Sequence, residues 1–135
     1  MSINIQPKFP SIFLRVALAV SYLWFSFDRL GLVGGPGDPH ISWGDWTHFM
    51  TFASHVMSFL PEQIVSVLAI TATIGELVFG TLLFVGYFTQ LAAIGSGILA
   101  FFFALSMAIS LGFESPLASS VFTVSAGSFL LAQVP

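Results

Sequence analysis

A single acidic residue lies inside the longest apolar stretch of this 135-residue chain. Glu76 is near the middle of residues 69–86, a run long and apolar enough to cross a bilayer. A carboxylate at that depth is energetically unfavourable, so it is expected to have a charged or hydrogen-bonding partner or a functional role. Glu76 is therefore predicted to form a structural ion pair or to serve a binding or proton-relay site.

Two arginines could supply that partner. Arg15, Tyr22 and Arg29 follow one another at intervals of seven residues, which places them on one face of a helix. With a rise of 1.5 Å per residue, Glu76 should lie level with Tyr22, and each arginine roughly 10 Å away in opposite directions. Either arginine could reach Glu76, and the sequence leaves both pairings open.

Two further residues complete the candidate polar core. Thr73 precedes Glu76 by one turn on the same small-or-polar stripe. Asp28 is adjacent to Arg29 but should point about 100° away from it, so we expect it to reach the outer interface or a second helix. These residues are interpreted either as a tie between helices or as a pocket for a small molecule, a quinone headgroup or a relayed proton.

Other reaction centres are not indicated. His48 and His55 share a helical face about 10 Å apart, whereas one metal ion needs ligands at about 2 Å, and His40 lies in a loop, so no metal site is predicted. The chain has no cysteine and no phosphate-binding or hydrolase motif, hence no catalytic motif of its own. A net charge of -3 with three basic residues argues against nucleic-acid binding.

The composition points to lipid as the main solvent. Hydrophobic residues make up 56% of the chain and charged residues only 7%, against roughly 25% charged residues in soluble domains. We expect an all-α integral membrane protein that contacts the lipid bilayer, a single domain over 1–135. Four transmembrane helices are predicted as a bundle, at about 11–34, 62–86, 91–111 and 117–131.

A fifth, amphipathic helix is expected at about 42–60. Its apolar stripe recurs at steps of three and four and comprises Trp43, Trp46, Met50, Ala53, Met57 and Leu60, widened by Phe49 and Val56. Ser42 and Asp45 have the spacing of a capping box. This helix could lie at the membrane interface, cover the mouth of the bundle, or do both.

Small residues suggest where helices pack closely. They are Ala93, Gly97, Ala100, Ala104 and Ala108 in the third predicted span, and Ser120, Thr123 and Gly127 in the fourth. Packing within the chain is the favoured interpretation, and a homo-oligomer interface is the alternative. Lys8 and Arg15 near the start of the chain, against acidic residues in the 35–60 loop, predict cytoplasmic N- and C-termini.

Several of these motifs together resemble one family. They are Arg15, Phe27-Asp-Arg-Leu30, Gly75-Glu-Leu-Val-Phe-Gly80 and the run Leu82–Ala93. This pattern is similar to the DoxX family of small four-helix bacterial membrane proteins. That family typically has Gly-x-x-Thr-Arg-x-Ala-Ala after the second helix, where this chain has Gln90 in place of the Arg, and the Trp-rich 42–60 segment is longer than in short members.

The resemblance implies association with a membrane redox system in the bacterial inner membrane. Members include the small subunit of a thiosulfate:quinone oxidoreductase and a partner in a thiol-oxidant defence complex. The expected function is thus an accessory or quinone-proximal subunit, with no intrinsic cofactor and a membrane or periplasmic oxidoreductase as partner. The alternatives are a small-molecule or proton transport module and a scaffold whose buried charges only fix helix packing.

Overall fold

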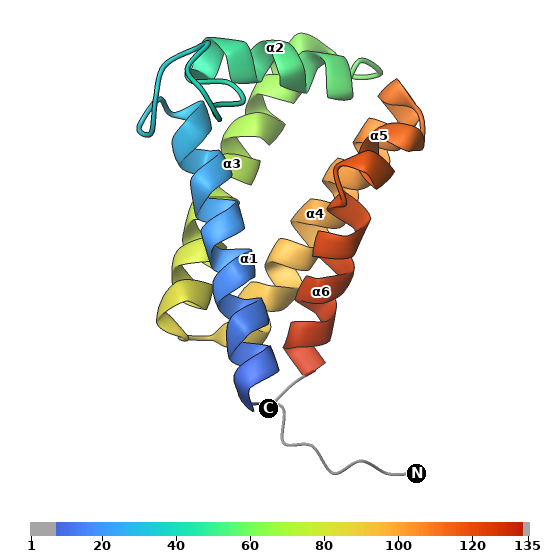
Figure 1. Ribbon diagram of the computed structural model, residues 1–135. Coiled ribbons are helices and arrows are strands. Elements are labelled where there is room, and N and C mark those ends of the chain that lie inside the picture. The colour runs from blue at the N-terminus through green and yellow to red at the C-terminus, as the bar shows by residue number, and fades with distance from the viewer. Residues whose placement is uncertain (1–7, 134–135) are drawn as a thin grey trace.

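The described part of the chain, residues 8–133 of a computed structural model, is all-helical and contains no strand. Its six helices are α1 Lys8–Arg29, α2 Trp46–Val56, α3 Glu62–Val85, α4 Thr89–Leu111, α5 Glu114–Ala118 and α6 Val121–Gln133. In Figure 1, α1 lies beside α3 and α4 beside α6, the two most extensive helix pairs, while α2 crosses the end where α1 stops and α3 starts.

Three helices are long and apolar enough to cross a membrane. They are the segment Phe9–Arg29 of α1, α3 and α4, with 21, 24 and 23 residues. Large apolar side chains such as Phe13, Val67 and Phe102 are exposed on them, which suggests contact with lipid. The apolar helix α6 is shorter: it has 13 residues and is about 20 Å long, less than the ~30 Å hydrocarbon core.

The first helix ends earlier than its apolar run predicts. We expected it to reach about residue 34, but α1 ends at Arg29. Gly31 takes a left-handed backbone conformation (φ 75°), and the Leu32 N–H donates to the Phe27 carbonyl at 2.9 Å. This is the bonding that closes a helix C-terminus, so the apolar residues after it continue as a loop.

The amphipathic helix is shorter than predicted. It runs over 11 residues, Trp46–Val56, rather than about 42–60. Gly44 has a φ of 83°, which an α-helix does not accommodate, so the helix cannot begin at Ser42. Asp45 is the N-cap instead, with its side chain accepting the His48 N–H at 2.8 Å.

The predicted span 117–131 is two helices. Ser120 has a φ of 59° and separates α5 from α6, because a left-handed residue interrupts the helical bonding. Of the small residues predicted to pack closely in this segment, Ser120 and Thr123 are exposed, while a Cβ added at Gly127 would lie 3.5 Å from the Leu14 side chain. The face carrying Ser125 and Ser128 is buried instead.

Close packing within the chain is confirmed for α4. The five small residues predicted to pack there are all buried: Ala93, Gly97, Ala100, Ala104 and Ala108. A Cβ added at Gly97 would lie 3.0 Å from the Phe129 ring of α6, and the Ser125 hydroxyl donates to the Gly97 carbonyl at 2.8 Å. Small residues here let the two backbones approach.

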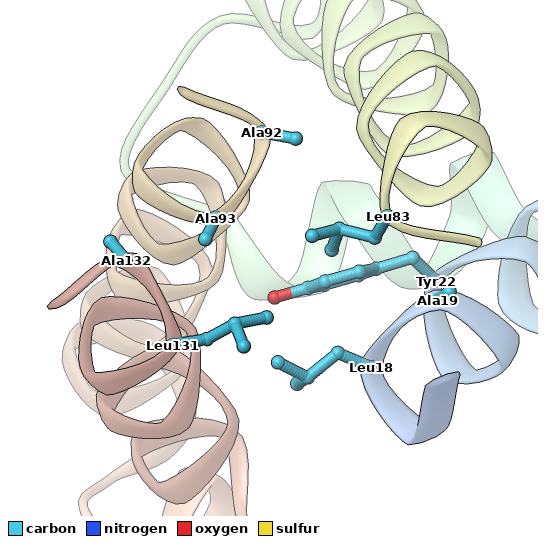
Figure 2. Close-up of a cluster of buried hydrophobic side chains, with 8 residues drawn as sticks. All are labelled: Leu18, Ala19, Tyr22, Leu83, Ala92, Ala93, Leu131 and Ala132. Carbon is cyan, nitrogen blue, oxygen red and sulfur yellow. The ribbon is translucent and has the colours of Figure 1, made fainter. Parts of the chain in front are cut away.

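Two apolar clusters fill the interior. The first is drawn in Figure 2 and comprises Leu18, Ala19, Tyr22, Leu83, Ala92, Ala93, Leu131 and Ala132. The second lies between α2 and α3 and comprises Phe49, Ala53, Val65 and Ala69, with Trp43 and Trp46 packed against it. Asp28 and Arg29, at the end of α1, lie next to this second cluster and the loop before it.

Candidate functional site

The register of α1 against α3 decides which residues meet. The Ser26 hydroxyl donates to Glu76 Oε2 at 3.0 Å, and a Cβ at Gly80 would lie 3.3 Å from Tyr22 Cβ. Glu76 is therefore level with Ser26, one helical turn from the expected Tyr22. The difference arises because α1 extends beyond the end of α3, so that Gly86 packs against Arg15 rather than against the first residues of α1.

Arg29, and not Arg15, is the partner of Glu76. Arg29 Nη2 lies 2.9 Å from Glu76 Oε2, the same oxygen that accepts from Ser26. The Arg29 side chain is 5% exposed and that of Glu76 21%. A directly paired and hydrogen-bonded charge is the form in which an ionised group is tolerated out of water.

The other nitrogens of Arg29 are also engaged. Nη1 donates to Thr73 Oγ1 at 3.0 Å, and Nε donates to the Phe25 carbonyl one turn earlier at 3.2 Å. Thr73 Oγ1 in turn donates to the Ala69 carbonyl at 2.8 Å. The guanidinium fork thus bonds its own helix and two side chains of α3.

Aromatic rings cover the guanidinium. Its central carbon lies 4.1 Å from the centre of the Phe49 ring and 5.3 Å from that of Trp43. These two rings meet edge to face with centres 5.0 Å apart. A cation over a ring face is attracted by the ring quadrupole, so Arg29 holds both α2 and the loop before it.

Asp28 binds the same loop by a different route. Its side chain is fully buried, and its carboxylate accepts the backbone N–H groups of Ser42, Trp43 and Gly44 at 2.8, 2.9 and 2.9 Å. We expected Asp28 to reach the outer interface or a second helix; it reaches the loop that leads into α2 and not a helix. These three hydrogen bonds to one carboxylate hold the backbone of residues 42–44 against the end of α1.

The start of α2 carries a second acid. Asp45 accepts the His48 N–H, and the His48 ring Nδ1 lies 2.8 Å from the same Oδ1. The backbone hydrogen bond from His48, followed by the bond to its ring, lowers the pKa of the Asp45 carboxyl. This pair is exposed, so it orders the first turn of α2 rather than forming a buried site.

Two predicted site residues lie outside the cluster. Tyr22 Oη lies 2.7 Å from Ser128 Oγ and donates to the Ser96 carbonyl at 3.4 Å, so it bonds α6 and α4. Figure 2 shows its ring between Leu83 and Leu18. Arg15 lies further along α1, beside Gly86. The structure therefore brings together Arg29, Glu76 and Thr73, with Asp28 adjoining.

Three members of the cluster were not among the predicted site residues. Ser26 precedes Arg29 by three residues on the same helical face, and that spacing could have identified it. Trp43 and Phe49 were assigned only to an apolar stripe. No sequence signal indicates that they lie over a cation, because that contact depends on how the loop folds back.

The cluster holds no arrangement suited to a metal. Within residues 8–133, no group of three His, Asp or Glu side chains could hold an ion. A shallow depression opens near the start of α3, but it is lined by Met50, Pro61, Glu62, Gln63 and Ser66 rather than by Tyr22, Thr73 and Glu76. The cluster pairs the Arg29 cation with the Glu76 carboxylate, and it leaves the Glu76 side chain partly exposed.

No protein-family model, no curated protein and no solved structure matches the chain.

Proposed function

We propose that this protein is a multi-pass membrane protein with four crossings and with α2 at the membrane interface, over the mouth of the bundle. α1, α3 and α4 are long and apolar enough for three crossings. The segment from Glu114 to Gln133, which comprises α5 and α6, would supply the fourth crossing despite the break between these two helices. Trp43, in the loop before α2, and Trp46, its first residue, suit the headgroup region.

The proposed location is the bacterial cytoplasmic membrane, with α2 outside and both ends of the chain inside. The supporting observation is that the α1 start carries Lys8 and Arg15, while the α2 end carries acidic residues. The chain lacks cysteine, so single cysteines report topology directly. An impermeant maleimide should label Thr47→Cys in spheroplasts and Gln90→Cys only after permeabilisation; the reverse pattern would invert the orientation.

Within that membrane, the protein acts as an accessory, non-catalytic subunit of a redox assembly. The observation that carries this role is the engagement of Arg29, which bonds Glu76, Thr73 and the Phe25 carbonyl and lies under two rings. Such a cluster ties α1, α3 and the α2 loop into one rigid surface that a partner could recognise. The sequence resemblance to the DoxX family suggests that the partner is a quinone-linked oxidoreductase.

Purification from native membranes in mild detergent tests this role. We expect an oxidoreductase subunit to co-purify with the tagged protein, together with extractable quinone. The same should hold for the folded fraction of Glu76→Gln, since the tie supports the surface without touching the partner. Recovery of the wild-type protein with neither a partner nor quinone would exclude the accessory role.

A second candidate function is binding of a quinone headgroup or relay of a proton at Glu76. It is favoured by one observation: the Glu76 side chain keeps 21% of its surface exposed while Arg29 keeps 5%. A short-chain quinone should then quench tryptophan fluorescence of the purified protein saturably. Loss of that quenching in Glu76→Gln, at an unchanged folded fraction, would favour this candidate over the structural tie.

A further inference from the structure

The two arginines of α1 differ in how their charge is matched. Arg29 has an acidic partner, whereas Arg15 has none in residues 8–133. The Arg15 Nε is buried and makes no hydrogen bond there. An arginine within an apolar helix is costly unless it reaches the interface or its charge is met by a counter-ion, and no described residue supplies that counter-ion.

Gly86 provides the space in which the Arg15 guanidinium lies. This glycine ends α3 with a φ of 82°, and its N–H and that of Tyr87 donate to the Leu82 carbonyl. A Cβ at Gly86 would overlap Arg15 Nη1. The guanidinium therefore lies directly against the backbone of the α3–α4 connection. A larger residue at position 86 would exclude it from this position.

The surroundings place this arginine near a membrane surface. Arg15 is seven residues from the start of α1, about 10 Å along the helix, and helical side chains lean toward the N-terminus. Tyr87 and Phe88 next to Gly86 are 69% and 68% exposed, as is typical of aromatic residues at headgroup level. None of the six acidic residues of the chain lies at this end.

We propose that Arg15, seated against Gly86, binds the phosphate of an anionic phospholipid headgroup on the membrane face where α1 begins. Arginine is the side chain best suited to phosphate, because its planar fork donates two parallel bonds. Attraction to a negatively charged leaflet adds to this preference. The inference rests on the membrane placement proposed above, but not on the redox role.

The test compares three phosphate sources with protein purified in a neutral detergent. Phosphatidylglycerol, phosphatidylcholine and inorganic phosphate are titrated separately, and the melting temperature and the lipid retained in native mass spectrometry are measured. We expect saturable stabilisation and retention with phosphatidylglycerol. In Arg15→Gln the affinity for it should fall about fivefold, while Arg15→Lys should retain part of it.

Glycine substitutions test the space at Gly86 separately from the charge of Arg15. Gly86→Ala should weaken retention of phosphatidylglycerol although Arg15 is kept. Gly112→Ala is the matched control, since Gly112 has a similar φ of 89° and no atom within 4 Å of an added Cβ. It should retain the lipid as the wild type does.

Three results would overturn the proposal. These are equal retention of phosphatidylcholine and phosphatidylglycerol by the wild type, unchanged retention by Arg15→Gln, and stabilisation by inorganic phosphate without preference for the anionic lipid. The last would identify a soluble phosphate as the ligand. Failure of the redox partner to co-purify would leave these measurements unaffected, whereas failure of membrane placement would show independently in the maleimide labelling.

Discussion

Asp28 and Arg29 are consecutive residues that hold two different parts of the chain. The Asp28 carboxylate accepts three N–H groups of the loop at residues 42–44, while the Arg29 guanidinium bonds Glu76 and Thr73 on α3. Neighbouring residues of a helix point about 100° apart. The last turn of α1 can therefore bind the loop on one side and α3 on the other, with its two opposite charges close together.

Replacing Asp28 should release the loop that precedes α2. Asp28→Asn keeps the shape of the side chain but turns one acceptor oxygen into a donor, so at least one loop N–H loses its partner. A buried unsatisfied group of this kind costs about 2 kcal/mol. Unfolding in detergent should show that loss, and amide exchange at residues 42–56 should speed up.

The matched control for that variant is Asp38→Asn. Asp38 also accepts a loop N–H, from Gly35 at 2.7 Å, but in an exposed position. It should change stability by less than about 0.5 kcal/mol. Equal effects of the two variants would mean that the hydrogen bonds of Asp28 stabilise the protein no more than the exposed bond of Asp38.

Gly44 should tolerate alanine much less well than Gly37. Both glycines have left-handed φ values, 83° and 86°, so the backbone strain of an alanine is similar. A Cβ at Gly44 would overlap the Pro36 backbone, whereas at Gly37 it meets nothing within 4 Å. Gly44→Ala should therefore cost at least about 1 kcal/mol more in unfolding free energy than Gly37→Ala; similar costs would show that the 35–44 loop has room to adjust.

The start of α2 should loosen in acid. The folded-state pKa of Asp45 is lowered by its bonds from His48, so its contribution is fully present above the unfolded pKa of about 3.9. That contribution is lost as the pH falls through the lower folded pKa. Amide exchange of residues 46–50, expressed relative to the intrinsic exchange rate at each pH and followed from pH 6 to pH 3 (roughly the range around that value), should rise at the acid end.

Asp45→Asn isolates this effect, because asparagine caps a helix as well as aspartate but does not titrate. In this variant, the acid-dependent rise in exchange at residues 46–50 should flatten. If the rise persisted unchanged, another group would have to be its source.

Much of the helical layout was predictable from local signals. The starts of α3 and α4 and the end of α3 follow from Pro61, Gly86 and long apolar runs. The arrangement of the 30–45 loop was not, because the Asp28 carboxylate that orders it accepts N–H groups 14 to 16 residues further along the chain. The break at Ser120 was missed because serine is not a strong helix breaker in sequence.

The polar core was predicted in composition but not in pairing. Glu76, Arg29, Thr73 and Asp28 were all identified as candidates from charge within apolar helices. The choice between Arg15 and Arg29 depended on a shift of one turn between α1 and α3, which periodicity on a single helix cannot reveal. Periodicity gives the face of a residue, whereas its level depends on where both helices begin and end.

The Arg29–Glu76 bond should behave as a structural tie. Glu76→Gln removes the negative charge and leaves the buried Arg29 cation uncompensated, which should cost about 3 kcal/mol. The same change at the exposed acid Glu62, at the start of the same helix, should change the unfolding free energy by less than about 0.5 kcal/mol.

The most direct measurement is a double-mutant cycle of unfolding free energies for Arg29→Gln and Glu76→Gln in one detergent. If the two side chains stabilise each other, the double variant should lose at least about 1 kcal/mol less than the sum of the single variants. Additive losses would show that the two charges act independently and would contradict the tie between α1 and α3.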